Sequence, residues 1–359
     1  MSQKILSLRQ NSAELRAALL DGTLRWENQL WSVLPREVAS HPIGLESVIF
    51  EVTPTSQLEK PNTWRVALQA IRPMGLGLAL APVLAVLVSD GWSRGWIPSH
   101  RDAVLVIFSI LCLQLAVHLL NDVEDHLRLV DRPGMVGGSG VLQRGWVSAR
   151  VLRVWGWAFW GLAIALGLPL LELGSGFLVF LGLVGVFGVA QFSSGPWALR
   201  YRAVGDFIVF LLTGPVLTVG AAQAVFHRWD LSDFVLGFFF GLTSWASFHS
   251  KHLQTFEADR QSGASNWAIW IGYKRSRYFL LVLYAMAYVS LGLGSIWGGI
   301  PLRVFQLVIL CVPLIYRQVL RVYQASGPVS VHLCQMRTQG LKIQIFLSLL
   351  ALIGFFLKF

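Results

Sequence analysis

Long apolar segments recur along the sequence from residue 73 onward, and each is long enough to cross a lipid bilayer as a helix. We place nine of them, at residues 73–92, 102–120, 151–170, 175–193, 205–226, 232–250, 276–297, 302–322 and 340–358. Charged residues make up only 13% of the 359-residue chain, whereas about a quarter is typical of soluble domains. The pattern predicts an all-α, multi-pass membrane protein, a bundle of about nine transmembrane helices.

Residues 1–62 are the only sizeable polar part of the chain. We expect them to form a cytoplasmic N-terminal segment, partly helical, beside a transmembrane domain of residues 63–359. Residues 12–26 have the spacing of an amphipathic helix, and the start of the chain lacks the apolar core of a secretion signal. In the membrane domain, Pro215 interrupts an apolar segment and predicts a kink there.

The formal net charge of +10 is compatible with nucleic-acid binding or with basic loops that face anionic lipid. The apolar composition favours the lipid bilayer as the partner and argues against nucleic acid. Connections after the even-numbered apolar segments hold sixteen Lys and Arg residues, against five on the other side. We therefore expect the even connections to face the cytoplasm, with the protein in the cell (inner) membrane. Three scattered cysteines form neither a disulfide framework nor a zinc motif.

A cluster of acidic residues follows the second apolar segment, on the side assigned to the cytoplasm. It consists of Asn121, Asp122, Asp125 and, six residues further on, Asp131. Carboxylates beside a membrane are costly unless something pairs with them, and Mg²⁺ prefers carboxylates together with phosphate oxygens. If the helix continues, the first three residues share one face. The cluster predicts a site for Mg²⁺ and a diphosphate, with a solvated loop of charges as the alternative.

A second polar segment follows the sixth apolar segment, on the same side of the bilayer. His252, Thr255 and Asp259 have the spacing of one helix face. Asp259 could bind a second metal ion, while Lys251 or Arg260 could neutralise phosphate charge. Taken alone, this segment is explained equally well as an ordinary polar loop.

The connection between the two polar segments supplies further candidates. Arg200 and Arg202 could bind diphosphate or anchor the chain at the membrane surface. Asp206 is another acidic residue at the start of an apolar segment, where an unpaired carboxylate is costly. The glycine-rich residues 137–140 could cradle phosphate through backbone N–H groups or form a plain turn.

With these motifs, the sequence resembles the UbiA-type superfamily of intramembrane aromatic prenyltransferases over about residues 64–358. Asn121-Asp122-x-x-Asp125 with Asp131 matches the first Asp-rich motif of that superfamily. Within it, the sequence is most similar to the 1,4-dihydroxy-2-naphthoate prenyltransferases of menaquinone biosynthesis. The segments that carry this finer resemblance are Arg72-Pro73, Gly137–Gly145, Gly195-Pro196 through Leu199, Tyr201-Arg202, Gly205-Asp206 and Gly214-Pro215.

The resemblance implies that Mg²⁺ held by two motifs binds an allylic prenyl diphosphate. Diphosphate departs, and an aromatic acceptor attacks the resulting cation, with loss of carboxylate when the acceptor is dihydroxynaphthoate. We expect Asp122 and Asp125 to be catalytic and Asp206 to orient the acceptor. The expected metal ligands are Asn121, Asp122, Asp125, Asp131 and Asp259. The expected diphosphate partners are Asn121, Arg128, Arg202, Lys251 and Arg260.

The second motif departs from the family pattern. The family usually has Asp four residues before the position of Asp259, where this chain has Thr255, and Ala264 stands where Lys is usual. Thr255 or Gln254 could act with water, the first cluster could carry most of the metal binding, or the chain could be a weakened paralogue. The sequence thus leaves open another acceptor, such as hydroxybenzoate, homogentisate, or a haem or chlorophyll precursor. It also leaves open an inactive membrane protein that binds lipid or a partner.

Overall fold

The computed structural model describes residues 4–9, 12–26, 29–40, 46–131, 138–172, 175–261, 263 and 265–357. The chain divides into two compact units. The first unit consists of Met1–Pro73 and Leu115–Phe159, and the second consists of Met74–Gln114 and Trp160–Phe359. The boundary between the units falls within two long helices, α4 (His100–Leu127) and α5 (Ala149–Gly167), so each unit contains a part of both.

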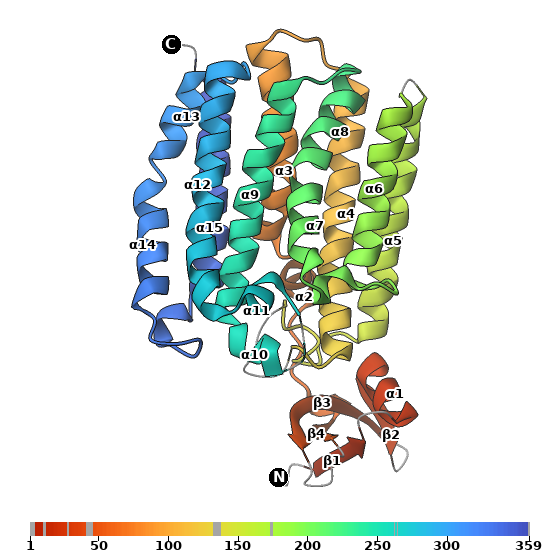
Figure 1. Ribbon diagram of the computed structural model, residues 1–359. Coiled ribbons are helices and arrows are strands. Elements are labelled where there is room, and N and C mark those ends of the chain that lie inside the picture. The colour runs from red at the N-terminus through yellow and green to blue at the C-terminus, as the bar shows by residue number, and fades with distance from the viewer. Residues whose placement is uncertain are drawn as a thin grey trace. The chain divides into compact units, whose positions relative to one another are not determined.

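A four-stranded antiparallel sheet forms the N-terminal part of the first unit (Figure 1). The strands are β1 (Lys4–Arg9), β2 (Thr23–Trp26), β3 (Gln29–Ser40) and β4 (Glu46–Pro54), in the order β1-β4-β3-β2. Val48 and Phe50 lie two residues apart on β4, so both point to the same face, where they are fully buried. Leu15 and Leu19 of helix α1 (Ala13–Asp21) pack into the same core.

The sheet corrects the expectation of a helix over residues 12–26. Ser12 caps α1 by accepting a hydrogen bond from the Leu15 N–H at 3.1 Å. Gly22 then takes the left-handed conformation, with φ of 62°, which ends the helix. The next four residues form β2, so the helix covers only the first part of the amphipathic pattern. A register shift between Pro35 and Glu37 interrupts the alternation of β3, and this bulge hides the strand in the sequence.

After the sheet, the first unit continues with a short helix, α2 (Thr63–Ile71), that ends at the charged residue Arg72. Asn62 caps α2 by accepting a hydrogen bond from the Arg65 N–H at 2.9 Å. The helix ends at Arg72, whose φ of 53° turns the chain before Pro73. Ala70 packs with Val123 of α4 in a buried cluster. This packing holds α2 against the part of α4 that carries the predicted acidic cluster.

The second unit is built of helices around α9 (Leu231–Gln254), which contacts α7, α8, α12 and α15. Figure 1 shows α12, α13, α14 and α15 beside one another next to α9. The other helices of this unit are α3 (Pro73–Val88), α6 (Gly176–Ser193), α7 (Val204–Thr213), α8 (Pro215–Phe226), α10 (Phe256–Gln261), α11 (Trp267–Ile271), α12 (Tyr273–Trp297), α13 (Leu302–Ile309), α14 (Val312–Gln324) and α15 (Met336–Phe356).

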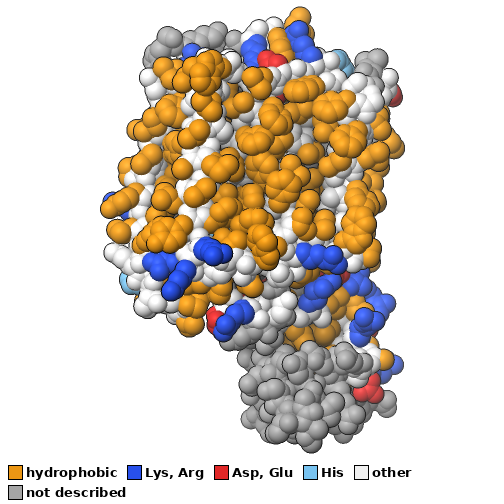
Figure 2. Space-filling model, in the orientation of Figure 1, with side chains coloured by type: hydrophobic (Ala, Val, Ile, Leu, Met, Phe, Trp, Pro, Cys, Tyr) orange, Lys and Arg blue, Asp and Glu red, His pale blue; other side chains and the backbone are white. Residues whose placement is uncertain are grey.

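The predicted helical membrane fold is confirmed, and the predicted number of spans is approximate. Within the described residues, seven helices are long and apolar enough to cross a membrane, or eight if the pair α13 and α14, bent by 46°, forms one span. The apolar part of α6, Gly176–Phe192, is slightly shorter than a full span. Figure 2 shows hydrophobic side chains along the helices on the visible face, with Lys and Arg gathered near helix ends. The exposed residues include Phe180, Leu183 and Phe187, and such a surface suits lipid.

Helix α7 ends at Thr213 and α8 begins at Pro215, so the apolar segment is interrupted at Gly214, next to the proline where a kink was expected. The break packs closely on α9. A Cβ atom on Gly237 would lie 2.6 Å from the Cα of Pro215 and 2.5 Å from the hydroxyl oxygen of Thr218. Only glycine leaves room for this approach, as in many membrane helix contacts.

Gly237→Ala should therefore destabilise the protein, since the added methyl group meets the backbone at Pro215. We expect a loss of about 1–3 kcal/mol, typical of overpacking, seen as a lower melting temperature of the detergent-solubilised protein. Gly182→Ala on α6 is the matched control, because no atom lies within 4 Å of its added methyl group. Equal melting temperatures for the two variants would contradict the close contact.

Candidate functional site

Asp122 lies near the end of α4 and is the centre of the candidate site in the first unit. Its side chain is buried, and α4 continues past the second apolar segment to include it, as predicted. One carboxylate oxygen, Oδ1, is 3.0 Å from a guanidinium nitrogen of Arg72. The other, Oδ2, accepts a hydrogen bond from the backbone N–H of Ser139 at 3.2 Å. The carboxylate is thus held between a cation and a loop.

Arg72 is a site residue that the sequence-based assignment of roles missed. Its guanidinium also donates a hydrogen bond to the carbonyl oxygen of His118 at 2.8 Å. The imidazole Nδ1 of His118 lies 2.6 Å from the carbonyl oxygen of Ile71, so the end of α2 is fixed to α4 at two points. The sequence signal was a charged residue immediately before the first apolar segment, where it needs a buried partner.

Gly138 brings two of the predicted acidic residues together. A Cβ atom on this glycine would lie 2.6 Å from Oδ1 of Asp122 and 2.6 Å from Oδ2 of Asp131. The two buried carboxylates therefore converge on one point, beside a position that has no side chain. The loop itself is anchored by Gln69, whose amide donates to the Ser139 carbonyl oxygen at 2.8 Å. Gly137, which also belongs to the glycine-rich segment, lies outside the described residues.

The oxygen atoms of this cluster are of the chemical type that a hard divalent cation binds. Besides the two converging carboxylates, the amide oxygen of Asn121 is buried and has no hydrogen-bond partner among the described residues. Asp125 is 1% exposed and lies one turn after Asp122 on α4, as the predicted helical continuation requires. Carboxylate and amide oxygens are donors that Mg²⁺ accepts. Within the described part of the chain, no three His, Cys, Asp or Glu side chains form a complete metal-binding group.

The second candidate site, in the second unit, is centred on His252 near the end of α9. Its Nε2 lies 3.0 Å from Oδ1 of Asp206, and its Nδ1 lies 3.3 Å from Oδ2 of Asp259. Both acids are buried. The backbone N–H of Trp267 donates to the other oxygen of Asp206 at 2.7 Å. An imidazole with a carboxylate at each nitrogen can donate to both only when it carries two protons.

Asp259 receives several donors on a single oxygen. The Thr255 hydroxyl and the Asn266 amide each donate to Oδ2 at 2.8 Å. Burial by itself raises the pKa of Asp259, but the hydrogen bond and charge of His252, the charge of Lys251 and the Thr255 hydroxyl together hold it below its usual value. Thr255, where the family usually has Asp, therefore stabilises the charge on Asp259.

His252 and Asn266 of this second site were not assigned roles from the sequence. The side chains of His252, Thr255 and Asp259 do meet, although the helix is interrupted at Thr255 between α9 and α10. The contact of His252 with Asp206 joins residues 46 positions apart and leaves no local pattern. Asn266 also caps α11 by accepting a hydrogen bond from the Ile269 N–H at 3.0 Å. In the sequence it has the ordinary appearance of a helix-capping residue.

The predicted basic residues lie in several different places. Arg128 is 44% exposed in its side chain, with Nε 3.7 Å from Glu124. Arg260 is ion-paired with Glu257 at 2.8 Å on the surface. Lys251 lies 5.8 Å from the ring centroid of Phe248. Arg202 is exposed at the end of the short helix Leu199–Tyr201, and Ala264 lies outside the described residues.

The comparisons with known proteins identify the family. A family model described as the UbiA prenyltransferase family matches residues 79–331. The chain is similar to the 1,4-dihydroxy-2-naphthoate octaprenyltransferase of Escherichia coli (strain K12), with 24% identity over 84% of this chain and 97% of that protein.

Solved structures show the same fold. One is the apo structure of a UbiA homologue from Aeropyrum pernix K1, with a TM-score of 0.59 and 15% identity over 79% of this chain and 97% of that one. Another is a UbiA homologue from Archaeoglobus fulgidus bound to DMAPP and Mg²⁺, with a TM-score of 0.52 and 16% identity over 77% of this chain and 98% of that one. Since the family model spans well over half of the sequence, the chain belongs to the UbiA prenyltransferase family and is a prenyltransferase.

Proposed function

We propose that the protein transfers a prenyl group from an allylic prenyl diphosphate to 1,4-dihydroxy-2-naphthoate, as a step of menaquinone biosynthesis at the cytoplasmic face of the cell inner membrane. The observation that carries the proposal is the convergence of the Asp122 and Asp131 carboxylates beside Gly138. The name of the Escherichia coli relative supports the acceptor, and the DMAPP and Mg²⁺ bound to the Archaeoglobus homologue support the donor and the metal.

The first cluster would hold the diphosphate through Mg²⁺. Asn121, Asp122, Asp125 and Asp131 are the proposed ligands, and bound Mg²⁺ would withdraw charge from the phosphate oxygens. Arg72 is well placed for a second role, because its guanidinium already lies 3.0 Å from Asp122. A phosphate oxygen near this carboxylate would lie within reach of the same cation. In this proposal Arg72 joins Arg128, Arg202, Lys251 and Arg260 as a diphosphate partner.

With dihydroxynaphthoate as acceptor, the reaction itself would consist of three bond changes. The allylic C–O bond breaks, and its electron pair leaves with the diphosphate. A ring carbon of the acceptor then forms the new C–C bond with the cation. With dihydroxynaphthoate, the ring regains aromaticity when the bond to its carboxylate breaks and CO₂ leaves. The protein's part is to stabilise the departing charge and to keep water from the cation.

Asp206 and Asp259 contribute through His252 in this proposal. Asp259 remains a candidate ligand for a second metal ion, because the hydrogen bonds described above all go to its Oδ2 atom. Asp206 would act as a positioning residue, because both of its oxygens already accept hydrogen bonds or contact His252. Phe207 follows it directly, and the rings of Trp245 and Trp267 lie 5.5 Å apart in an edge-to-face contact.

An acceptor panel tests the proposal directly. Membranes containing the protein are incubated with a labelled prenyl diphosphate, Mg²⁺ and each acceptor in turn: dihydroxynaphthoate, hydroxybenzoate, homogentisate and a haem precursor. We expect prenylated product with dihydroxynaphthoate, and Asp122→Ala should lower its formation at least about 100-fold while the protein still inserts in the membrane. Product with another acceptor alone would replace the proposed substrate. Normal turnover by Asp122→Ala would contradict the site.

Gly138→Ala tests the convergence of the carboxylates. The new methyl group would occupy the point between Asp122 and Asp131, so we expect turnover to fall about 10–100-fold and the Mg²⁺ requirement to rise. The measurement is product formation as a function of Mg²⁺ concentration. Gly161→Ala is the control, since no atom lies within 4 Å of its added methyl group. An unchanged Mg²⁺ dependence in Gly138→Ala would argue against a metal at this point.

Substitutions of Thr255 decide between a working second site and a weakened paralogue. Thr255→Val keeps the shape but removes a donor to Asp259, so we expect about tenfold lower turnover, with Thr255→Ser close to wild type. Thr255→Asp should also lower turnover, because it places a second carboxylate beside Asp259. If Thr255→Asp instead raises a low activity, the second motif has decayed and the weakened-paralogue explanation gains.

A further inference from the structure

The end of helix α4 adopts a backbone conformation that its own sequence does not favour. The Leu129 N–H donates to the carbonyl oxygen of His126 at 3.1 Å. The Val130 N–H donates to the carbonyl oxygen of Asp125 at 2.9 Å, and the two bonds together form the Schellman pattern of a helix end. Leu129 occupies the left-handed position of this turn, with φ of 58°. Glycine is usual at that position, because a side chain is crowded at positive φ, so a leucine there must be held by other contacts.

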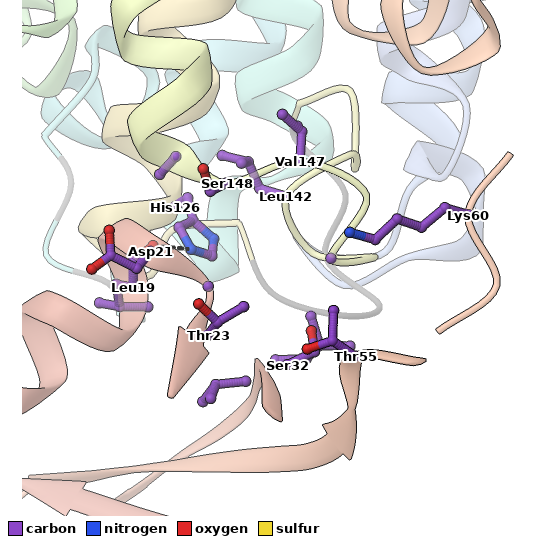
Figure 3. Close-up of a pocket in the computed structure, with 15 residues that line it drawn as sticks. Leu19, Asp21, Thr23, Ser32, Thr55, Lys60, His126, Leu142, Val147 and Ser148 are labelled. Atoms are coloured by element: carbon purple, nitrogen blue, oxygen red, sulfur yellow. Dashed lines mark hydrogen bonds between the residues drawn. The ribbon is translucent and has the colours of Figure 1, made fainter. Parts of the chain in front are cut away.

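The N-terminal sheet and α1 supply those contacts. The Leu129 side chain is only 6% exposed, and it belongs to the buried cluster that also contains Val48 and Phe50 of β4. A hydrogen bond fastens the same helix end, since Nε2 of His126 donates to the carbonyl oxygen of Leu19 in α1 at 3.1 Å (Figure 3). The last turn of α4 is therefore held by side-chain packing and by a backbone contact, both from the N-terminal part of the chain.

This turn brings Asp131 back toward α4. The Asp131 N–H donates to the carbonyl oxygen of Asp125 at 3.3 Å, and the Asp131 side chain is buried. Its Oδ2 lies beside Gly138, at the point that Oδ1 of Asp122 also reaches. With the usual negative φ at Leu129, the chain would leave the helix in another direction. The convergence of the two carboxylates therefore depends on the left-handed turn.

The sheet also contacts the loop that follows Gly138. A Cβ atom on Gly145 would lie 2.9 Å from a methyl carbon of Leu34 and 3.1 Å from the hydroxyl oxygen of Ser32, both on β3. The same loop carries Ser139, whose N–H donates to Asp122. The sheet thus lies against both segments that converge on the Asp122 carboxylate.

We propose that Leu129 is a positioning residue of the diphosphate site, and that the N-terminal sheet holds it in the conformation that places Asp131 beside Asp122. The sheet precedes residue 79, where the match to the family model begins, so an element outside the matched domain shapes the site. This inference rests on the proposed function, because it takes Asp122 and Asp131 as ligands of the metal ion.

The test is a titration of the full-length, detergent-solubilised protein with Mn²⁺ alone, in which the electron paramagnetic resonance signal reports the free ion. Leu129→Ala keeps the crowding at positive φ but removes most of the packing, so we expect the Mn²⁺ affinity to fall about tenfold or more. Leu129→Gly removes the packing and the crowding together, so the turn persists and the affinity should stay close to that of the wild type. Leu291→Ala is the matched control, because Leu291 is a fully buried leucine of α12 in the second unit. It should lower the melting temperature without changing the Mn²⁺ affinity.

The order of the two Leu129 variants separates a positioning role from a purely structural one. If Leu129 only stabilised the sheet, Leu129→Gly would be at least as harmful as Leu129→Ala, because it removes more of the side chain. Unchanged affinity in Leu129→Ala, or equal losses in both variants, overturns the inference even if prenyl transfer to dihydroxynaphthoate is observed. The expected order supports it even if the acceptor panel finds no such transfer. Absence of saturable Mn²⁺ binding to the wild type overturns the inference together with the proposed metal site.

Val48→Ala tests the same inference from the sheet, even if Leu129→Ala fails to fold. It removes two methyl groups from the cluster that holds Leu129, so the Mn²⁺ affinity should fall. Adding Leu129→Gly should restore it, because glycine adopts the left-handed turn without support from the sheet. Unchanged affinity in Val48→Ala, or a double variant that binds Mn²⁺ no better than the single one, contradicts the inference.

Discussion

Buried carboxylates need a compensating charge, and this requirement organises the polar part of the structure. Asp122 lies near the end of a helix that is apolar over most of its length, and an ionised side chain there is costly without a partner. The ion pair with Arg72 meets the requirement and fixes the end of α2 to α4. The same carboxylate also orders the loop at Ser139. The Asp122 carboxylate thus ties a helix end and a loop to α4.

The second unit solves the same problem with hydrogen bonds around one imidazole. His252 lies between Asp206 and Asp259, and Thr255 adds a donor where the family usually has a third acid. A hydroxyl here carries less negative charge than a third carboxylate would, and it donates to Asp259. The threonine is therefore part of a satisfied network, which is different from a simple loss of a ligand.

Much of the membrane fold was predictable because its signals are local. Apolar length located the spanning helices, Pro215 located the break, and the spacing of Asn121, Asp122 and Asp125 predicted a shared helix face. The N-terminal sheet was not predicted, since the bulge near Pro35 disturbs the alternation that identifies a strand. Arg72 was also missed as a site residue, because its partner is 50 positions away in the sequence.

The sequence by itself determined that this protein folds in a lipid membrane, where its acidic residues lie along the chain, and which family it resembles. These properties follow from apolar length and from oxygen-rich side chains beside it, both of which are written in neighbouring residues. The tertiary structure decided which cation accompanies Asp122, how Asp131 reaches the same point through the open space at Gly138, and what Thr255 does for Asp259. These pairings depend on packing between distant segments, so only the folded chain brings their atoms within bonding distance.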